Sequence, residues 1–190
     1  MTVSREQAAY ARKDCRSLDV TIELKDYREL SGQFDRIVSL GMMEHVEAKN
    51  YRTYMQILRR CLKTAGLCLL QTIAGNTSVR TMDPWIERYI FPNSMLPSAR
   101  QIAAANEGLL MLEDWHNFGP HYDKTLMAWY RNFTRNGDRL KAFYDERFYR
   151  MWTCYLLSCA GSFRARRNQL WQIVFSKNGL KKECHYRRSV

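Results

Sequence analysis

The sequence lacks several features that would assign it to common classes of protein. No apolar run approaches the roughly 20 residues that a membrane-spanning helix needs, and residues 1–6 show no basic segment followed by an apolar one, so we read no secretory signal. The six cysteines form no Cys-x-x-Cys pair and the four histidines offer no partner spacing, so no metal site is predicted. These absences favour a cytoplasmic protein with free thiols over a disulfide scaffold.

Positive charge is the property that most needs a cause. The 190 residues carry a formal net charge of +11, and such an excess favours binding to nucleic acid, an anionic membrane surface or an acidic partner. Much of it lies late in the chain, at Arg164, Arg166, Arg167, Lys177, Lys181, Lys182, Arg187 and Arg188. A solvated face with a frayed basic tail over residues 178–190 explains the charge about equally well.

Hydrophobic periodicity predicts a single α/β domain. Strands are expected at 19–26, 34–40, 67–73, 109–118 and 169–176, and helices at 4–16, 48–63, 98–106, 122–133 and 138–166. The alternation of strands and helices predicts a parallel sheet with crossover helices. Ligands of such sheets lie beyond the carboxyl ends of the strands, which directs attention to residues 26–27, 41–44 and 71–73.

Two further segments are rich in large apolar residues. Residues 83–97 combine apolar side chains with three prolines, and they form either a lid over an apolar ligand or a small satellite core. The helix expected at 138–166 carries a stripe at spacings of three and four, which we expect to pack on the sheet. The stripe consists of Tyr144, Phe148, Trp152, Tyr155, Cys159 and Phe163.

Several short runs, taken together and in order, resemble one enzyme family. They are TVSREQ (2–7), DYR (26–28), GMMEHV (41–46), DPWI (83–86), YIFPN (89–93), EDWHNFG (113–119), YDKTLMAWY (122–130), CAG (159–161), FRAR (163–166) and LWQ (170–172). The combination is similar to the cyclopropane-fatty-acyl-phospholipid synthases and the mycolic acid cyclopropane synthases. The likeness covers residues 1–177 and leaves out the basic tail.

The resemblance implies an incomplete Rossmann-like fold of the S-adenosylmethionine (SAM)-dependent methyltransferases. That fold has the strand order 3-2-1-4-5-7-6, and this chain is expected to lack the first two strands. The strand at 19–26 would then lie beside a gap or pair again with the strand at 34–40. Either arrangement exposes apolar sheet edges, so we expect one truncated domain of low stability.

The family implies an activity and a catalytic cluster. Its members transfer a methyl group from SAM to the cis double bond of a phospholipid acyl chain, and loss of a proton closes a cyclopropane ring. The base is attributed to a bound bicarbonate ion. The cluster that holds it maps onto Glu44, Tyr122 and the backbone amide of Ile73, with Gln71 where the family usually has a histidine. Taken alone, Glu44 would more often be a surface or helix-capping residue, and Tyr122 could be an ordinary packing residue on a helix.

The resemblance also implies a cofactor site. Thr2, Val3 and Gln7 would lie near the ribose and methionine parts of SAM, Asp26 and Tyr27 beside the adenine, and Leu40 along its pocket. Helix capping and a turn after a strand are the structural alternatives. No Gly-x-Gly occurs anywhere in the chain, although a glycine-rich turn holds the amino-acid part of SAM in such enzymes. We therefore expect little or no affinity of this chain for SAM.

Three functions remain open at this point. The first is methyl transfer to an unsaturated phospholipid by a protein on the inner face of the cell membrane, with a homodimer possible. The second is a non-catalytic remnant of an interrupted gene. The third, a basic module for an anionic membrane surface or nucleic acid, ranks last, because the aromatic and glycine pattern of an RNA-binding sheet is missing, and we expect no nucleic-acid partner.

Overall fold

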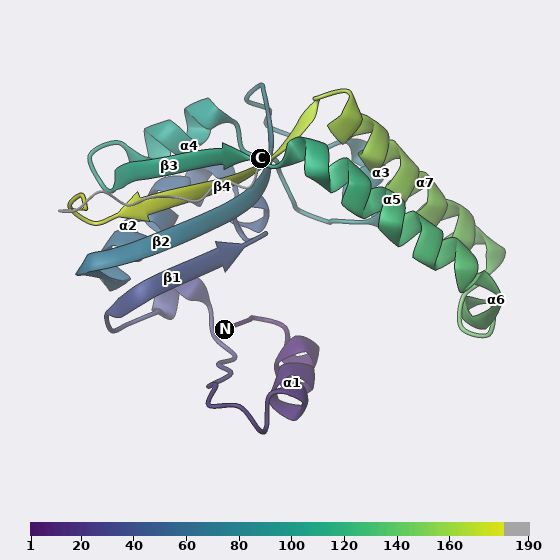
Figure 1. The fold of residues 1–190 in the computed structure, drawn as a ribbon, viewed down its shortest axis with the longest axis horizontal. Coiled ribbons are helices and arrows are strands. Elements are labelled where there is room, and N and C mark those ends of the chain that lie inside the picture. Colours follow the sequence, from purple (N-terminus) through teal and green to yellow (C-terminus); the bar gives the residue numbers. More distant parts are fainter. Residues whose placement is uncertain (181–190) are drawn as a thin grey trace.

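The centre of the fold is a mixed sheet with the order β1-β2-β4-β3 (Figure 1). The computed structural model describes residues 1–180. Strand β1 (Phe34–Leu40) is parallel to β2 (Leu62–Gly75), whereas β4 (Asn168–Ser176) is antiparallel to β2 and to β3 (Met111–Asn117). The order agrees with the last four strands of the sequence expected for the methyltransferase fold, and the expected α/β class is confirmed.

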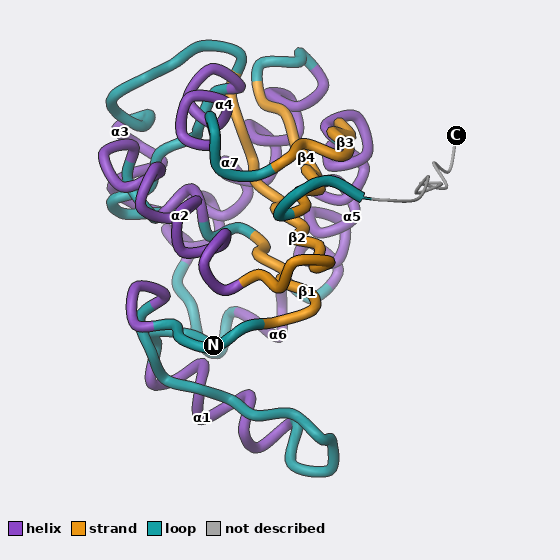
Figure 2. Tube along the Cα trace, turned by 90° about the vertical axis from the view of Figure 1, so that its left-hand side faces the viewer, coloured by secondary structure: helices purple, strands orange, loops and turns teal. Residues whose placement is uncertain are grey.

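One face of the sheet is covered by two helices, α2 (Tyr51–Cys61) and α4 (Ala99–Asn106), which lie on the same side of the strands (Figure 2). Helix α2 connects β1 to β2, so the predicted crossover helix is confirmed. Alternate strand residues point into this layer, and Leu70 and Ile173 have no exposed surface. The opposite face is more open, because Val38 is 63% exposed.

Helices α5 (Gly119–Arg135) and α7 (Glu146–Arg164) pack against each other and extend beyond the end of the sheet (Figure 1). The prediction that the aromatic stripe of α7 packs on the sheet is therefore wrong for most of its length. Phe148 lies edge-on to Phe133 of α5 and stacks on Trp152 of α7 and on Tyr144, which lies just before α7. The stripe forms a second core with α5, because α5 offers aromatic partners at the same helical spacing.

The helix expected at 138–166 is also interrupted. A short helix α6 (Gly137–Leu140) precedes α7, and the chain turns between them. The turn ends at Asp145, whose carboxylate accepts a hydrogen bond from the backbone N–H of Phe148 at 2.8 Å. An aspartate that caps a helix in this way competes with continuation of the preceding helix. Apolar periodicity does not reveal such a cap, so it predicted one helix where the chain has two.

The strand expected at 19–26 does not form, and that prediction is wrong. The segment is extended, but only Leu24 pairs, in an isolated parallel bridge with Thr2. A strand needs a neighbour to satisfy its backbone groups, and the described chain supplies none here. Val20 is 53% exposed, so its alternating apolar residues do not reach a core. The outer edge of β1 is correspondingly unpaired within residues 1–180, and the expected exposure of apolar groups there is confirmed.

The remaining elements are short. Helix α1 (Arg5–Asp14) begins where expected, with Ser4 accepting from the backbone N–H of Gln7. Three 3-10 turns are η1 (Tyr27–Glu29), η2 (Met43–His45) and η3 (Ala48–Asn50), and the apolar segment at 83–97 contains a helix, α3 (Pro84–Tyr89), that was not expected. Proline is compatible with α3 because it occupies the first turn.

The described part of the chain contains no helix with both the length and the apolar character that membrane crossing requires. Lys181, Lys182, Arg187 and Arg188, which carry most of the predicted basic tail, lie outside the described residues.

Candidate active site

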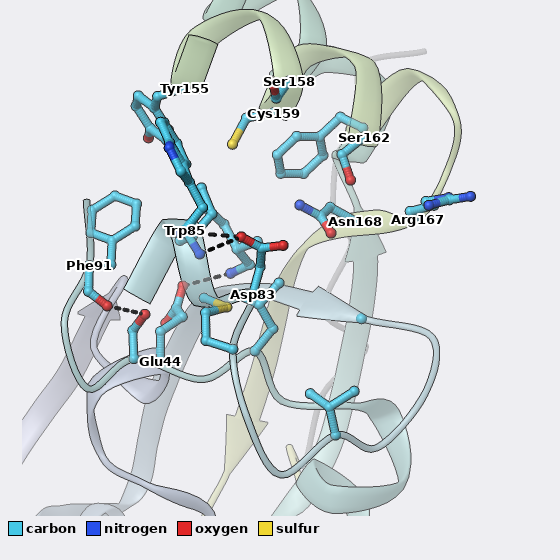
Figure 3. Close-up of a pocket in the computed structure, with 18 of the residues that line it drawn as sticks. Glu44, Asp83, Trp85, Phe91, Tyr155, Ser158, Cys159, Ser162, Arg167 and Asn168 are labelled. Carbon is cyan, nitrogen blue, oxygen red and sulfur yellow. Dashed lines mark hydrogen bonds between the residues drawn. The ribbon is translucent and has the colours of Figure 1, made fainter. Parts of the chain in front are cut away.

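A cavity of about 940 Å³ opens beyond the carboxyl ends of β1 and β2, where the sheet rule predicts a ligand (Figure 3). Its walls come from η2, the segment 75–96 and the facing sides of α5 and α7. The walls are mainly apolar, formed by Trp85, Ile86, Phe91, Leu96, Leu126, Tyr155 and Phe163. The size and lining are those of a site for a small molecule or an acyl chain.

Glu44 is a buried carboxylate in the wall of this cavity. It lies on η2, just after β1, and the residue is only 7% exposed. Its Oε1 accepts a hydrogen bond from the backbone N–H of Ile73 at 2.7 Å, whereas Oε2 is buried without a partner in residues 1–180. Burial raises the pKa of Glu44, because removal from water disfavours the charged carboxylate.

Tyr122 faces the same cavity from α5. Its ring contacts Phe163 edge-on, with centroids 4.9 Å apart, and its hydroxyl makes no hydrogen bond within the described chain. Burial raises the pKa of Tyr122, with smaller contributions from the Cys159 thiol and the Glu44 carboxylate. The structure therefore brings Glu44, Ile73 and Tyr122 to one cavity, as the resemblance implied.

Gln71 lies apart from these three residues. It is on the open face of the sheet, and its Oε1 accepts from Nε2 of Gln172 at 2.7 Å. The strand register places Leu40, Gln71, Gln172 and His116 in one cross-strand row on that face. Gln71 is not among the residues that line the cavity.

The segments expected to hold SAM meet at the N-terminus. The backbone N–H of Thr2 donates to the carbonyl of Glu23, and that of Lys25 donates to the carbonyl of Thr2, at 3.0 and 2.9 Å. Thr2 also donates from its hydroxyl to Oε1 of Gln7 at 2.7 Å. The bridge thus brings Thr2 and Gln7 beside the stretch that leads to residues 26–27. Val3, between them, is 72% exposed.

Of the residues expected around the adenine, two already contact other side chains and the third is exposed. Asp26 forms a two-pronged pair with Arg28, which lowers the pKa of Asp26 to about 2. Tyr27 packs edge-on against Tyr54. Leu40, at the end of β1, is 58% exposed.

Sequence reasoning missed most of the cavity wall that α7 supplies. Tyr155, Cys159 and Ser162 line the cavity, and so does Arg167 just after the helix (Figure 3). Tyr155 and Cys159 belong to the stripe at spacings of three and four, which we assigned to the sheet, whereas no sequence pattern indicated Ser162 or Arg167. A stripe on one long helix cannot reveal which partner it faces, because packing on a sheet and packing on a helix use the same spacing.

Comparisons of sequence agree with the resemblance. The family model described as mycolic acid cyclopropane synthetase matches residues 1–173. A cyclopropane-fatty-acyl-phospholipid synthase of Escherichia coli strain K12 is 54% identical over 184 residues, covering 95% of this chain and 48% of the relative. The tuberculostearic acid methyltransferase UfaA1 of Mycobacterium tuberculosis is 31% identical, covering 94% of this chain and 44% of the relative. The chain thus spans about half the length of the curated relatives it matches.

Solved structures share the fold. The cyclopropane synthase MmaA2 of Mycobacterium tuberculosis superposes with a TM-score of 0.83 at 24% identity, over 92% of this chain and 68% of that one. The mycolic acid cyclopropane synthase CmaA1, solved in complex with SAH and CTAB, gives a TM-score of 0.81 at 25% identity with the same coverage. With the family model matched over residues 1–173, this chain belongs to the mycolic acid cyclopropane synthetase family of SAM-dependent methyltransferases.

Proposed function

We propose that this chain carries the lipid-binding and proton-accepting side of a methyltransferase that converts the cis double bond of a phospholipid acyl chain into a cyclopropane ring. One observation carries the proposal: in the described part of the chain, the buried carboxylate of Glu44 has an oxygen without a hydrogen-bond partner in the wall of an apolar cavity of about 940 Å³. A carboxylate in such surroundings is costly unless it serves a ligand or a reaction. The 54% identity to the Escherichia coli synthase supports the same assignment.

The cavity walls suit a reaction that passes through positive charge. An alkene is a weak nucleophile, and its methylation leaves a carbocation that water would trap. Apolar walls exclude water from the acyl chain. The faces of Tyr122, Tyr155 and Phe91 offer electron density that stabilises a cation. SAM, when bound, supplies the methyl group.

The residues of the cavity fit a small oxyanion such as bicarbonate. Within residues 1–180, Glu44 Oε2 is an acceptor without a donor, which suits the hydroxyl of that ion. The hydroxyl of Tyr122, in the wall of the same cavity, suits its oxygens. The Ile73 amide already donates to Glu44, so its part is to orient the carboxylate. Glu44 would fix the orientation of an ion held in this way, and the ion would supply the base for the proton that ring closure releases.

The residues on the cofactor side fit SAM only in part. Leu40 and Val3 present exposed apolar surface, and Asp26 is an acceptor for hydroxyl groups, although Arg28 already occupies both of its oxygens. These 190 residues contain no Gly-x-Gly turn for the amino-acid part. We therefore propose no step of the reaction through these residues.

A chimera tests the proposed function. The segment of the Escherichia coli synthase that matches this chain is replaced by residues 1–173 of this chain, the range that the family model matches. The product is incubated with methyl-labelled SAM and phospholipid vesicles. We expect label in monounsaturated lipid, with a mass gain of one methylene per double bond by mass spectrometry, and no label in fully saturated lipid. A folded chimera that labels neither lipid contradicts the proposal and favours a non-catalytic remnant.

A membrane-surface role is a second proposal, supported by the net charge of +11. Each basic residue near an anionic surface contributes about 1 kcal/mol of attraction. We expect the chain to sediment with vesicles that contain phosphatidylglycerol and to be released by added salt. Equal sedimentation with neutral phosphatidylcholine vesicles would contradict this role.

A further inference from the structure

The cavity has two chemically different ends. Glu44 and Phe91 lie at one side of it, whereas Arg167, Asn168 and Ser162 lie at the other (Figure 3). Large apolar side chains form the wall between them. A ligand that fills the cavity from end to end therefore needs an apolar body and a polar group that leaves it near Arg167.

The chain fixes the position of Arg167 through the turn that ends α7. Arg166 adopts a left-handed conformation with φ of 60°, and the backbone N–H of Arg167 donates to the carbonyl of Ser162 at 3.0 Å. This is the hydrogen bond of a Schellman motif. The carbonyl of Arg166 accepts from the side chains of Asn76 and Gln169, at 3.0 and 2.8 Å. The rim of the cavity is thus held by both the 75–79 loop and the start of β4.

Arg167 has no partner for its charge in residues 1–180. The two neighbouring arginines are engaged: Arg164 forms a pair with Asp123, and Arg166 donates to Gln169. The guanidinium of Arg167 makes no hydrogen bond or ion pair in that part of the chain, and the residue is exposed. Asp83, the acidic residue nearer the middle of the cavity, accepts the backbone N–H groups at the start of α3 through Oδ1.

We propose that Arg167, assisted by Asn168 and Ser162, binds the phosphodiester of the lipid whose acyl chain occupies the cavity. The proposal rests on the proposed function and adds the site that recognises the headgroup. A planar guanidinium donates two parallel hydrogen bonds to phosphate oxygens, and no other cation among the cavity-lining residues has that geometry. At the rim the phosphate remains hydrated, whereas deeper in the cavity its desolvation would be costly.

The test compares two short ligands with the same acyl-glycerol body, of which only one carries a phosphoglycerol headgroup. Decanoyl lysophosphatidylglycerol and decanoyl glycerol are titrated below their micellar concentrations into the purified chain and followed by calorimetry. We expect Arg167→Gln to weaken binding of the phosphate-containing lipid about fivefold and to leave decanoyl glycerol unchanged. Inorganic phosphate alone is expected to bind neither protein measurably and not to compete, because it lacks the apolar body.

Arg150→Gln is the matched control, since Arg150 is an exposed arginine on α7, the helix that precedes Arg167, and does not line the cavity. It removes the same charge and is expected to bind both lipids like the unchanged protein. Equal weakening by the two substitutions would overturn the site in favour of general electrostatic attraction. Competition by inorganic phosphate at equal affinity would overturn the lipid assignment. Failure of the unchanged protein to bind decanoyl glycerol would instead count against the acyl cavity itself, and so against the proposed function.

Discussion

Glu44 is an ionisable carboxylate that the fold buries, and its burial affects the stability of the folded chain. Burial raises its pKa above the ordinary value of 4.5, so the folded chain holds a proton that the unfolded chain has already lost. Stability is therefore lost as the pH rises from about the unfolded value through the folded one, and the full penalty is present above both.

Glu44→Gln removes that penalty and keeps an acceptor for the Ile73 amide. We expect the variant to gain stability over the unchanged chain as the pH rises from 4.5 to 8, by about 1.4 kcal/mol for each unit by which burial raises the pKa. Urea unfolding at several pH values measures the difference. The same pH dependence in both proteins would show that Glu44 is not buried in its ionised form.

Two tyrosines on α2 differ in one hydrogen bond. Tyr54 donates to Oγ of Ser39 at 2.6 Å, whereas the hydroxyl of Tyr51 is buried without a partner in residues 1–180. We expect Tyr54→Phe to cost about 1–2 kcal/mol, because it leaves Ser39 unpaired, and Tyr51→Phe to stay within about 0.5 kcal/mol or to stabilise. The two variants are each other's control in urea unfolding, and equal losses would contradict the assignment.

At the scale of secondary-structure elements, the outer edge of β1 is an exposed strand edge that can pair with another chain. Its backbone is unpaired in the described chain, and Val38 is 63% exposed on the strand. Strands of this kind associate with other chains. We expect Val38→Lys to reduce concentration-dependent association in light scattering, with a change in unfolding free energy of under about 0.5 kcal/mol.

Leu18→Lys is the control for that substitution. Leu18 is 60% exposed but lies outside the sheet, so the same charge is added without touching an edge. Association that falls equally in both variants would indicate a general effect of charge and would contradict the role of β1.

The sequence predicted the elements whose patterns are local, and missed those that depend on partners. The strands at 34–40 and 169–176 formed because their apolar residues meet a neighbouring strand. The segment at 19–26 has an equally clear alternation and stayed off the sheet, because alternation does not state whether a partner exists. For the same reason the α7 stripe was found but assigned to the wrong surface. Glu44, Ile73 and Tyr122 were reached only through the family resemblance, since no spacing relates positions so far apart in the chain.

For the molecule as a whole, the two halves of the expected site differ. The cavity side is assembled, whereas the cofactor side has exposed Val3 and Leu40 and an Asp26 bonded to Arg28. We expect titration of the purified 190-residue chain with SAM to show no binding at micromolar concentrations. A dissociation constant in the micromolar range would contradict the expectation that the cofactor side binds SAM weakly. If Leu40→Lys then abolished the heat of binding, SAM would be placed at these residues.

The most direct test of the account concerns Glu44 in a catalytically complete protein. In the chimera with the Escherichia coli synthase, the rate of methyl transfer from labelled SAM to monounsaturated phospholipid is measured with Glu44 and with Glu44→Gln, after calorimetry has shown equal lipid affinity. Without the carboxylate the proton-accepting ion would no longer be oriented, and formation of labelled product is expected to slow about a hundredfold or more. Equal rates in the two proteins would show that the buried carboxylate has no part in the chemistry, and would contradict the central claim.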